Sequence, residues 1–142
     1  MDISVAFKIC ASGLAAQRAK TDIIASNLAN IDTTKTPEGG PYKRKVISFS
    51  SEPIKNRGFD RKLRDAVNGV SIGEIKESRE GFKMISDPGH PDADGEGFVS
   101  FPNINLVSEM TDMIMAGRAY EACVTAFDAT KSMALKTLEI GR

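Results

Sequence analysis

Residues 3–31 read ISVAFKICASGLAAQRAKTDIIASNLANI, and this stretch predicts a single long α-helix. It contains no proline, and the mostly apolar positions on one of its faces are spaced alternately by four and three residues. The mean step of about 3.5 is the coiled-coil period. The positions on this face are Ile3, Phe7, Cys10, Leu14, Gln17, Thr21, Ile24, Leu28 and Ile31. Helix-breaking residues then gather between Asp32 and Pro41, so the helix is expected to end near residue 31.

The C-terminal part of the chain repeats this pattern and predicts a second long helix. Its face carries the positions Leu106, Met110, Met113, Gly117, Tyr120, Val124, Phe127, Lys131, Ala134 and Leu138. Either Asn103 or Asn105 can cap the start of this helix, and Glu109 is favourably placed near its positive end. The polar positions Gln17, Thr21 and Lys131 either fix the register of a coiled coil or mark where the face turns to solvent.

The middle of the chain differs from both ends, because it holds most of the glycines and all six prolines. Four short runs in it are typical of β-strands, namely Tyr42–Phe49, Val70–Ile75, Gly81–Ile85 and Phe98–Phe101. We therefore predict a mainly α protein with a small β insert. Two long terminal helices with heptad seams, residues 1–31 and 103–142, flank a short β-rich region, residues 32–102.

Composition argues against several classes of function. Lys plus Arg and Asp plus Glu both number 19, so the net charge is zero, whereas nucleic-acid and anionic-membrane partners favour a basic excess. The basic run Lys43–Lys45 and the second run, between Lys55 and Arg64, are expected to be solvated loop surface. No apolar stretch approaches the roughly 18 residues of a membrane helix. The N-terminal residues also lack the pattern of a cleaved signal peptide, so any export is expected to use another route.

No motif in the sequence points to catalysis or to a cofactor. One histidine and two cysteines cannot supply four zinc ligands, and there is no nucleophile elbow, P-loop or dinucleotide fingerprint. Asp92, Asp94 and Glu96 resemble the start of a calcium loop, but the twelfth position is Asn103, where a bidentate acid is needed. We expect no catalytic, cofactor-binding or metal-binding residue. Cys10 and Cys123 are expected to be buried thiols, although paired terminal helices could bring them together.

Two long helices with apolar seams need further helices to cover them, which predicts association. The sequence also resembles a known family across nearly its whole length. Ser12–Gln17, Asn27–Asn30 and Thr33–Thr34 resemble the N-terminal signature of bacterial flagellar axial proteins, the rod, hook and filament-junction subunits. Further stretches resemble the subunits of the proximal rod in particular. They are residues 34–44, 87–94, 102–105, Val107, 109–110, 118–122, Lys131, Met133 and 138–142. The chain departs from that pattern at Cys10 and Cys123.

The resemblance implies a structural subunit without enzymatic activity. Such subunits pass unfolded through the flagellar type III export apparatus, without a cleaved signal peptide, and polymerise into the periplasm-spanning rod of the basal body. The rod carries torque from the rotor to the hook. The expected partners are copies of the chain itself, other rod subunits, proteins on the MS-ring and export-gate side, and hook-side rod proteins. Neither nucleic acid nor direct membrane insertion is expected.

The residues expected to form the assembly interface lie on both terminal helices. They are Phe7, Leu14, Ile24, Asn27, Leu28, Asn30, Met110, Met113, Tyr120, Val124 and Phe127. Asn27 and Asn30 share a helix face and could bind the backbone of a neighbour, or Asn30 could simply end the helix. Two other functions remain open: another flagellar axial subunit, or a soluble coiled-coil adaptor that recruits partners.

Overall fold

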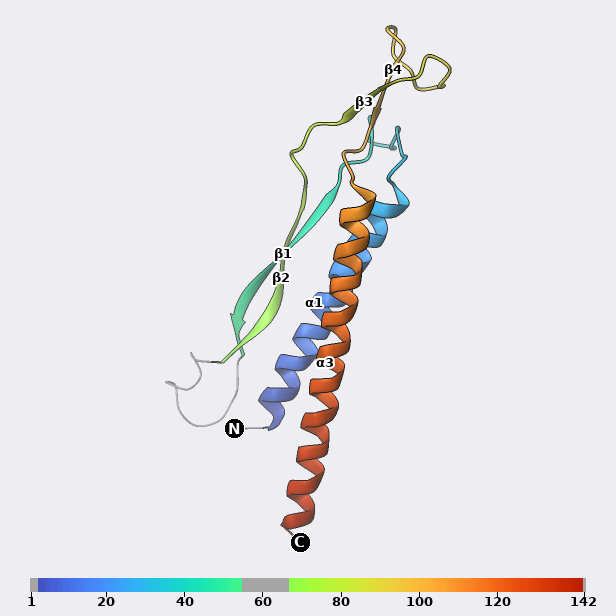
Figure 1. Ribbon diagram of the computed structural model, residues 1–142. Coiled ribbons are helices and arrows are strands. Elements are labelled where there is room, and N and C mark those ends of the chain that lie inside the picture. Colours follow the sequence, from blue (N-terminus) through green and yellow to red (C-terminus); the bar gives the residue numbers. More distant parts are fainter. Residues whose placement is uncertain (1–2, 55–66, 142) are drawn as a thin grey trace. The chain divides into compact units, whose positions relative to one another are not determined.

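A computed structural model describes residues 3–54 and 67–141 of the chain (Figure 1). The elements are α1 (Ile3–Ala29), β1 (Lys45–Pro53), β2 (Asn68–Glu77), β3 (Lys83–Ser86), β4 (Phe98–Phe101) and α3 (Leu106–Ile140). The prediction of a mainly helical chain with a small β insert is confirmed, and each predicted β run overlaps one strand. The basic run between Lys55 and Arg64 lies outside the described residues.

The chain forms two compact units, and both long helices contribute to each of them. The first unit consists of Met1–Thr21, Ser48–Glu74 and Ile114–Arg142. The second unit consists of Asp22–Ile47 and Ile75–Met113. Strands β1 and β2 pair in one two-stranded sheet, and β3 and β4 pair in another.

In the first unit, the N-terminal part of α1 packs antiparallel against the C-terminal part of α3. The rings of Phe7 and Phe127 lie with their centroids 4.9 Å apart. Two turns further along α1, Gly13 faces Cys123, whose sulfur would lie 3.2 Å from a Cβ built on the glycine. Ala16 and Ala116 are both buried. Small residues at these positions let the two helix backbones approach closely, so the unit packs without large aromatic side chains at most contacts.

The part of the β1–β2 pair that belongs to the first unit also contacts α1. The Ser12 hydroxyl donates a hydrogen bond to the Ile9 carbonyl at 2.8 Å and accepts one from the backbone N–H of Val70 at 3.2 Å. The adjacent Gly69 is buried, and a Cβ there would lie 3.0 Å from the Ser12 oxygen and 3.3 Å from Ile54. A side chain at residue 69 would therefore separate the strand from the helix.

Two helical glycines should respond differently to replacement by alanine. Gly117→Ala is expected to raise the free energy of unfolding by about 1 kcal/mol, because alanine favours a helix and the site opens to space. Gly13→Ala should gain clearly less, because the new methyl group meets the Cys123 sulfur. Urea unfolding followed by circular dichroism measures both. Equal gains at the two sites would show that the Cys123 side chain moves aside without cost.

In the second unit, β3 and β4 form an antiparallel hairpin with Lys83 opposite Phe101 and Ser86 opposite Phe98. Val99 is fully buried, and the rings of His90 and Phe101 pack in an edge-to-face arrangement with their centroids 6.1 Å apart. Within the hairpin loop, the Asp94 carboxylate accepts hydrogen bonds from the backbone N–H groups of Glu96 and Phe98. The acidic side chains of this loop thus accept hydrogen bonds from the backbone and stabilise its turns. Among the described residues, no group of three or more His, Cys, Asp or Glu side chains gathers as metal ligands would.

Neither of the long helices is suited to crossing a lipid bilayer. Over residues 3–54 and 67–141, no helix combines the length and the apolar character that a membrane span requires.

Candidate functional site

Two polar side chains are almost completely buried in the second unit, at the end of α1 and the start of α3. Asn27 is 1% exposed and Glu109 is 2% exposed. Buried polar groups need hydrogen-bond partners to offset the loss of water. Every fully buried side-chain nitrogen and oxygen among the described residues has such a partner. We refer to Asn27, Tyr42, Arg44, Lys45 and Glu109 as the polar junction.

The Asn27 amide binds the backbone at the start of β1. Its Oδ1 accepts a hydrogen bond from the Lys45 N–H at 2.9 Å, and its Nδ2 donates one to the Lys45 carbonyl at 2.9 Å. The Tyr42 hydroxyl donates a further hydrogen bond to Oδ1 at 3.2 Å. A side-chain amide offers the same donor and acceptor as a peptide group. Asn27 therefore serves as a one-residue strand partner and joins α1 to β1.

The Glu109 carboxylate binds two side chains from other elements. Arg44 Nε donates a hydrogen bond to its Oε1 at 2.7 Å, and Arg44 Nη2 forms an ion pair with the same oxygen at 2.6 Å. Asn27 Nδ2 donates to Oε2 at 3.2 Å. The Arg44 side chain is 26% exposed, so the ion pair lies at the edge of the unit with its acid inside. A buried carboxylate is tolerated only when it is paired and hydrogen-bonded in this way.

Capping residues at the start of α3 and the end of α1 determine where the side chains of the polar junction lie. The Asn105 side chain accepts hydrogen bonds from the N–H groups of Val107 and Ser108, so Asn105 rather than Asn103 caps α3. This cap fixes Glu109 in the first turn. At the end of α1, Asn30 Nδ2 donates to the Ser26 carbonyl at 2.8 Å, and Asn30 Oδ1 accepts from Thr33 at 3.2 Å. These two hydrogen bonds are those of a residue that ends a helix, and the assembly role of Asn30 stays a prediction.

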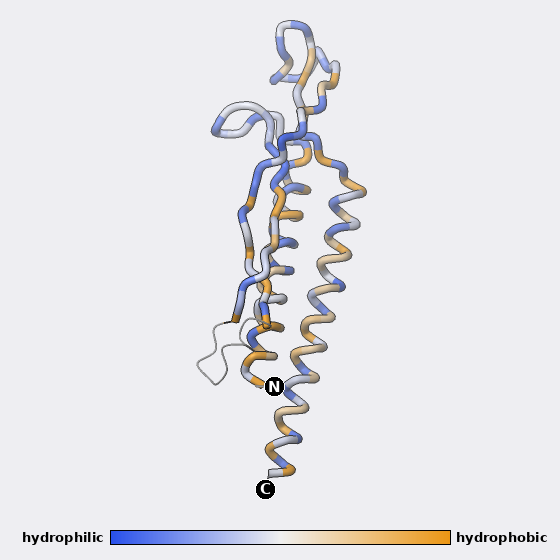
Figure 2. Tube along the Cα trace, turned by 90° about the vertical axis from the view of Figure 1, so that its left-hand side faces the viewer, coloured by the Kyte–Doolittle hydropathy of each residue, from blue (hydrophilic) through white to orange (hydrophobic). Residues whose placement is uncertain are grey.

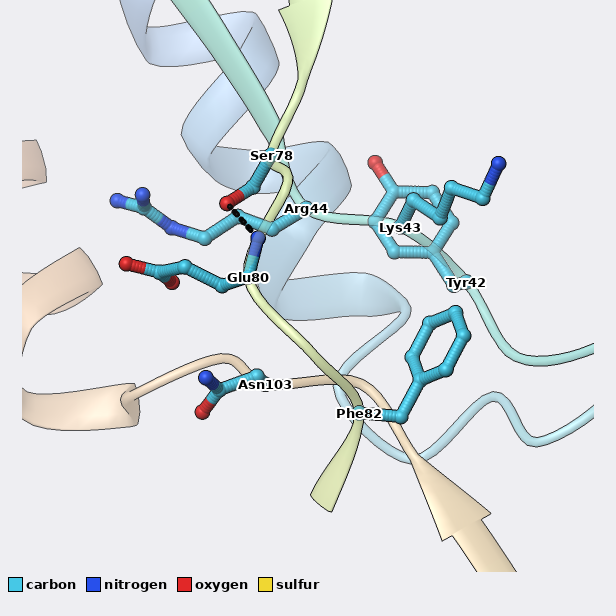
Figure 3. Close-up of a pocket in the computed structure, with 7 residues that line it drawn as sticks. All are labelled: Tyr42, Lys43, Arg44, Ser78, Glu80, Phe82 and Asn103. Atoms are coloured by element: carbon cyan, nitrogen blue, oxygen red, sulfur yellow. Dashed lines mark hydrogen bonds between the residues drawn. The ribbon is translucent and has the colours of Figure 1, made fainter.

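A small pocket lies beside the polar junction (Figure 3). Its walls are Tyr42, Lys43, Arg44, Ser78, Glu80, Phe82 and Asn103. The Arg44 and Glu80 side chains extend to one side, while the rings of Tyr42 and Phe82 lie on the other (Figure 3). Its volume of about 10 Å³ is at the lower limit for one water molecule. The pocket is therefore far too small for an organic substrate.

The apolar residues expected at the assembly interface fall into two groups. Within the chain, Ile24 is buried, and Phe7, Leu14, Leu28, Met113 and Phe127 are half-buried. Met110, Tyr120 and Val124 remain exposed, Met110 by as much as 51%. Asn27, also expected there, has its side-chain amide occupied within the chain. The structure describes a single chain, so the assembly role of these residues stays a prediction.

The exposed apolar surface of α3 is larger than the predicted seam. It includes Ile114, at 58% exposed, together with Leu106, Val107, Met115, Met133, Leu135, Leu138 and Ile140. Figure 2 shows hydrophobic and hydrophilic segments alternating along this helix. Large exposed apolar side chains at several turns of one helix are typical of a surface that binds another protein. The sequence showed the helical spacing, but it did not show which apolar residues the chain itself covers.

Sequence reasoning also missed the partners of the polar junction. The basic run Lys43–Lys45 predicts solvated side chains, yet Arg44 binds Glu109, which is 65 positions away in the chain. Its neighbour Lys43 does form a solvated ion pair, with Glu77. The separate preferences of Glu109 for a helix start and of Asn27 for a backbone contact were visible, but no local signal indicated that the two residues meet.

Comparison with known proteins gives consistent matches along the chain. The family described as "Flagella basal body rod protein" matches residues 7–35, and the one described as "Flagellar basal body rod FlgEFG protein C-terminal" matches residues 96–140. The chain is 42% identical to the flagellar basal-body rod protein FlgC of Bacillus subtilis, over 94% of this chain and 95% of that one. It is 44% identical to the FlgC protein of Aquifex aeolicus, over 98% and 97% of the two chains. The corresponding protein of Borreliella burgdorferi is 39% identical, over 99% and 98%.

Proposed function

We propose a function from the family of this chain: it belongs to the family of the flagellar basal-body rod protein FlgC, and it is a structural subunit of the basal-body rod. In this role it polymerises through its terminal helices into the proximal part of the drive shaft that transmits torque from the rotor to the hook. It carries out no catalysis and needs no cofactor.

The observation that carries the assembly mechanism is the exposed apolar surface of α3. Burying apolar area stabilises a contact by about 25 cal/mol per Å², and one chain leaves this surface uncovered. We propose that residues 1–31 and 103–142 act as the axial helices and that residues 32–102 form the insert. The exposed Met110, Tyr120 and Val124 contact neighbouring subunits. The remaining apolar residues pack the helices of each subunit against each other and so set the surface that its neighbours bind. They are Phe7, Leu14, Ile24, Leu28, Met113 and Phe127.

The heptad spacing of both helices supports coiled-coil-like seams between subunits. A shaft under torsion needs many contacts that share the load, and head-to-tail contacts between identical chains generate an open helix. The partners are further copies of this chain, other rod subunits, and the proteins on the export-gate and hook sides. We further propose that the flagellar type III apparatus exports the chain to the basal body without cleavage of a signal peptide.

The experiment that tests this function is an in-frame deletion of the gene in the host bacterium. Motility on soft agar and electron micrographs of isolated basal bodies are the readouts. Loss of rod, hook and filament, restored by the gene in trans, is the expected result. Motile deletion cells with intact hook–basal bodies would contradict the rod function. A soluble adaptor that forms a saturable complex would then be the better account.

A single charge should distinguish the exposed face of α3 from its surroundings in the same strain. Met110→Asp is expected to abolish complementation, because it places a carboxylate in a surface that must lose its water on assembly. Thr111→Asp is the matched control, since it adds the same charge one residue further along, at another exposed position. Immunoblots establish equal amounts of both variants. Full motility with Met110→Asp would show that this face stays in solvent.

A further inference from the structure

In the first unit, the outer faces of the two long helices carry complementary sets of exposed side chains. On α1, Lys8, Ala11, Ala15 and Arg18 are all exposed, and their spacing of three, four and three residues puts them on one face. On α3, Ile114, Gly117, Glu121, Val124 and Asp128 are exposed and share one face by the same spacing. We name these the small face of α1 and the large face of α3.

The two faces are complementary in size. The small face presents two alanines at its centre, so a partner helix can approach its backbone closely. The large face presents Val124 and Ile114, which are 37% and 58% exposed. Knobs of this size fit the spaces between small residues of a facing helix, as in coiled-coil packing. Neither set of side chains buries itself within the chain, so both are available to a neighbour.

The two faces are also complementary in charge. Lys8 and Arg18 bound the small face, and Glu121 and Asp128 lie on either side of Val124 on the large face. Two bases ten residues apart span about 15 Å of helix, and two acids seven residues apart span about 10 Å. The long, flexible stems of lysine and arginine cover the difference. On the same face of α3, Lys131 follows Asp128, while Arg118 and Lys136 lie about a quarter turn away from it.

The antiparallel contact within the unit sets the register in which the faces would meet. Phe7 faces Phe127 and Gly13 faces Cys123, so residues whose numbers add up to about 135 lie at the same level. A neighbouring copy that keeps the same direction and level presents its Asp128 to Lys8. Its Glu121 then lies about one helical turn, roughly 6 Å, from the level of Arg18, within reach of the long arginine side chain. Val124 then falls at the level of Ala11, and Lys131 at that of the uncharged Ser4.

We propose that the large face of α3 docks on the small face of α1 of a second copy of this chain, with Asp128 on Lys8 and Glu121 on Arg18. The inference rests on the proposed rod function and names the contact between adjacent copies within it. The contact is heterologous, since each copy uses its α1 for one neighbour and its α3 for the other. Such a contact repeats around a ring or along an open helix.

Cysteine cross-linking between two single-thiol variants tests the contact. The background chain carries Cys10→Ser and Cys123→Ser, and a strain co-expresses Ala11→Cys on one copy and Val124→Cys on another. Each chain then holds a single thiol, on α1 in one variant and on α3 in the other. A disulfide between the two different thiols therefore joins two copies. Basal bodies isolated after mild oxidation are expected to contain the mixed dimer. The matched control replaces Val124→Cys with Ala126→Cys, an exposed position on the opposite side of α3, and should give no such product.

Charge reversal supplies an independent readout. Lys8→Glu with Arg18→Glu is expected to abolish swarming, as is Glu121→Lys with Asp128→Lys. A chain with all four changes should swarm again, because every copy then carries both reversed faces. A fourfold variant that stays non-motile, or basal bodies that contain both thiol variants without the mixed dimer, would overturn the contact and leave the rod function standing. Basal bodies that lack the chain altogether would contradict both the contact and the rod function.

Discussion

Arg44→Met is expected to lower the free energy of unfolding by about 3 kcal/mol, because it leaves the Glu109 carboxylate buried without its cation. Broken buried ion pairs cost about 3–5 kcal/mol, and we take the lower end because Arg44 is 26% exposed. Urea unfolding of the full chain, followed by circular dichroism, gives the difference.

Lys43→Met is the matched control for this measurement. Lys43 precedes Arg44 in the chain and pairs with Glu77 at 3.0 Å, but these side chains are 54% and 50% exposed. Exposed pairs contribute about 0–1 kcal/mol, so the control should change stability little. The double variant Arg44→Met with Glu109→Leu should recover part of the loss, because it removes the unpaired charge. Equal losses for Arg44→Met and Lys43→Met would refute a stabilising role for the buried pair.

Asn27→Asp is expected to be at least as damaging, although the two side chains have nearly the same shape. The substitution replaces the Nδ2 donor with an oxygen, which then faces the Lys45 carbonyl at 2.9 Å and the Glu109 carboxylate at 3.2 Å. Unsatisfied buried polar groups cost about 1–3 kcal/mol each, and charged ones cost more. We expect a loss of about 3 kcal/mol or more from repulsion at both contacts.

Asn30→Asp makes the same chemical change three residues further along, at the half-buried end of α1. It loses one hydrogen bond, to the Ser26 carbonyl, and it meets no carboxylate among its hydrogen-bond partners. Its cost should stay at about 1–2 kcal/mol, because the half-buried side chain loses one hydrogen bond and its new charge lies at the negative end of the helix dipole. If Asn27→Asp proved no more harmful than Asn30→Asp in the same urea titration, the polar junction would not hold α1 and β1 together.

The sequence sufficed for the elements that follow from local patterns. The apolar period and the absence of proline predicted α1, and the cluster of breakers predicted its end close to Ala29. Asn105 and Glu109 marked the start of α3, because capping and the helix dipole act within one turn. The four β runs were visible from their composition. These features depend on neighbours a few residues away.

The contacts between distant segments could not be predicted in the same way. The partner of Arg44 is 65 positions away, and a basic run in a loop looks the same whether or not it meets a buried acid. The period of α3 allowed several neighbouring faces, and the chain covers the one with small residues, including Ala116 and Cys123. The resemblance to axial proteins identified the family, but it did not separate the residues that fold the subunit from those left exposed.

The hydrogen bonds between Asn27 and Lys45 also occupy part of the edge of β1, where a strand of another chain could otherwise pair. The next residue back, Arg44, accepts from Ser78 on the β2 side, so the Lys45 peptide groups point to the other edge of the strand. An unpaired strand edge is a template on which another chain can add its own strand. Here a helix side chain occupies that edge where β1 begins. The Asn27 side chain thus blocks strand addition at the point where β1 begins.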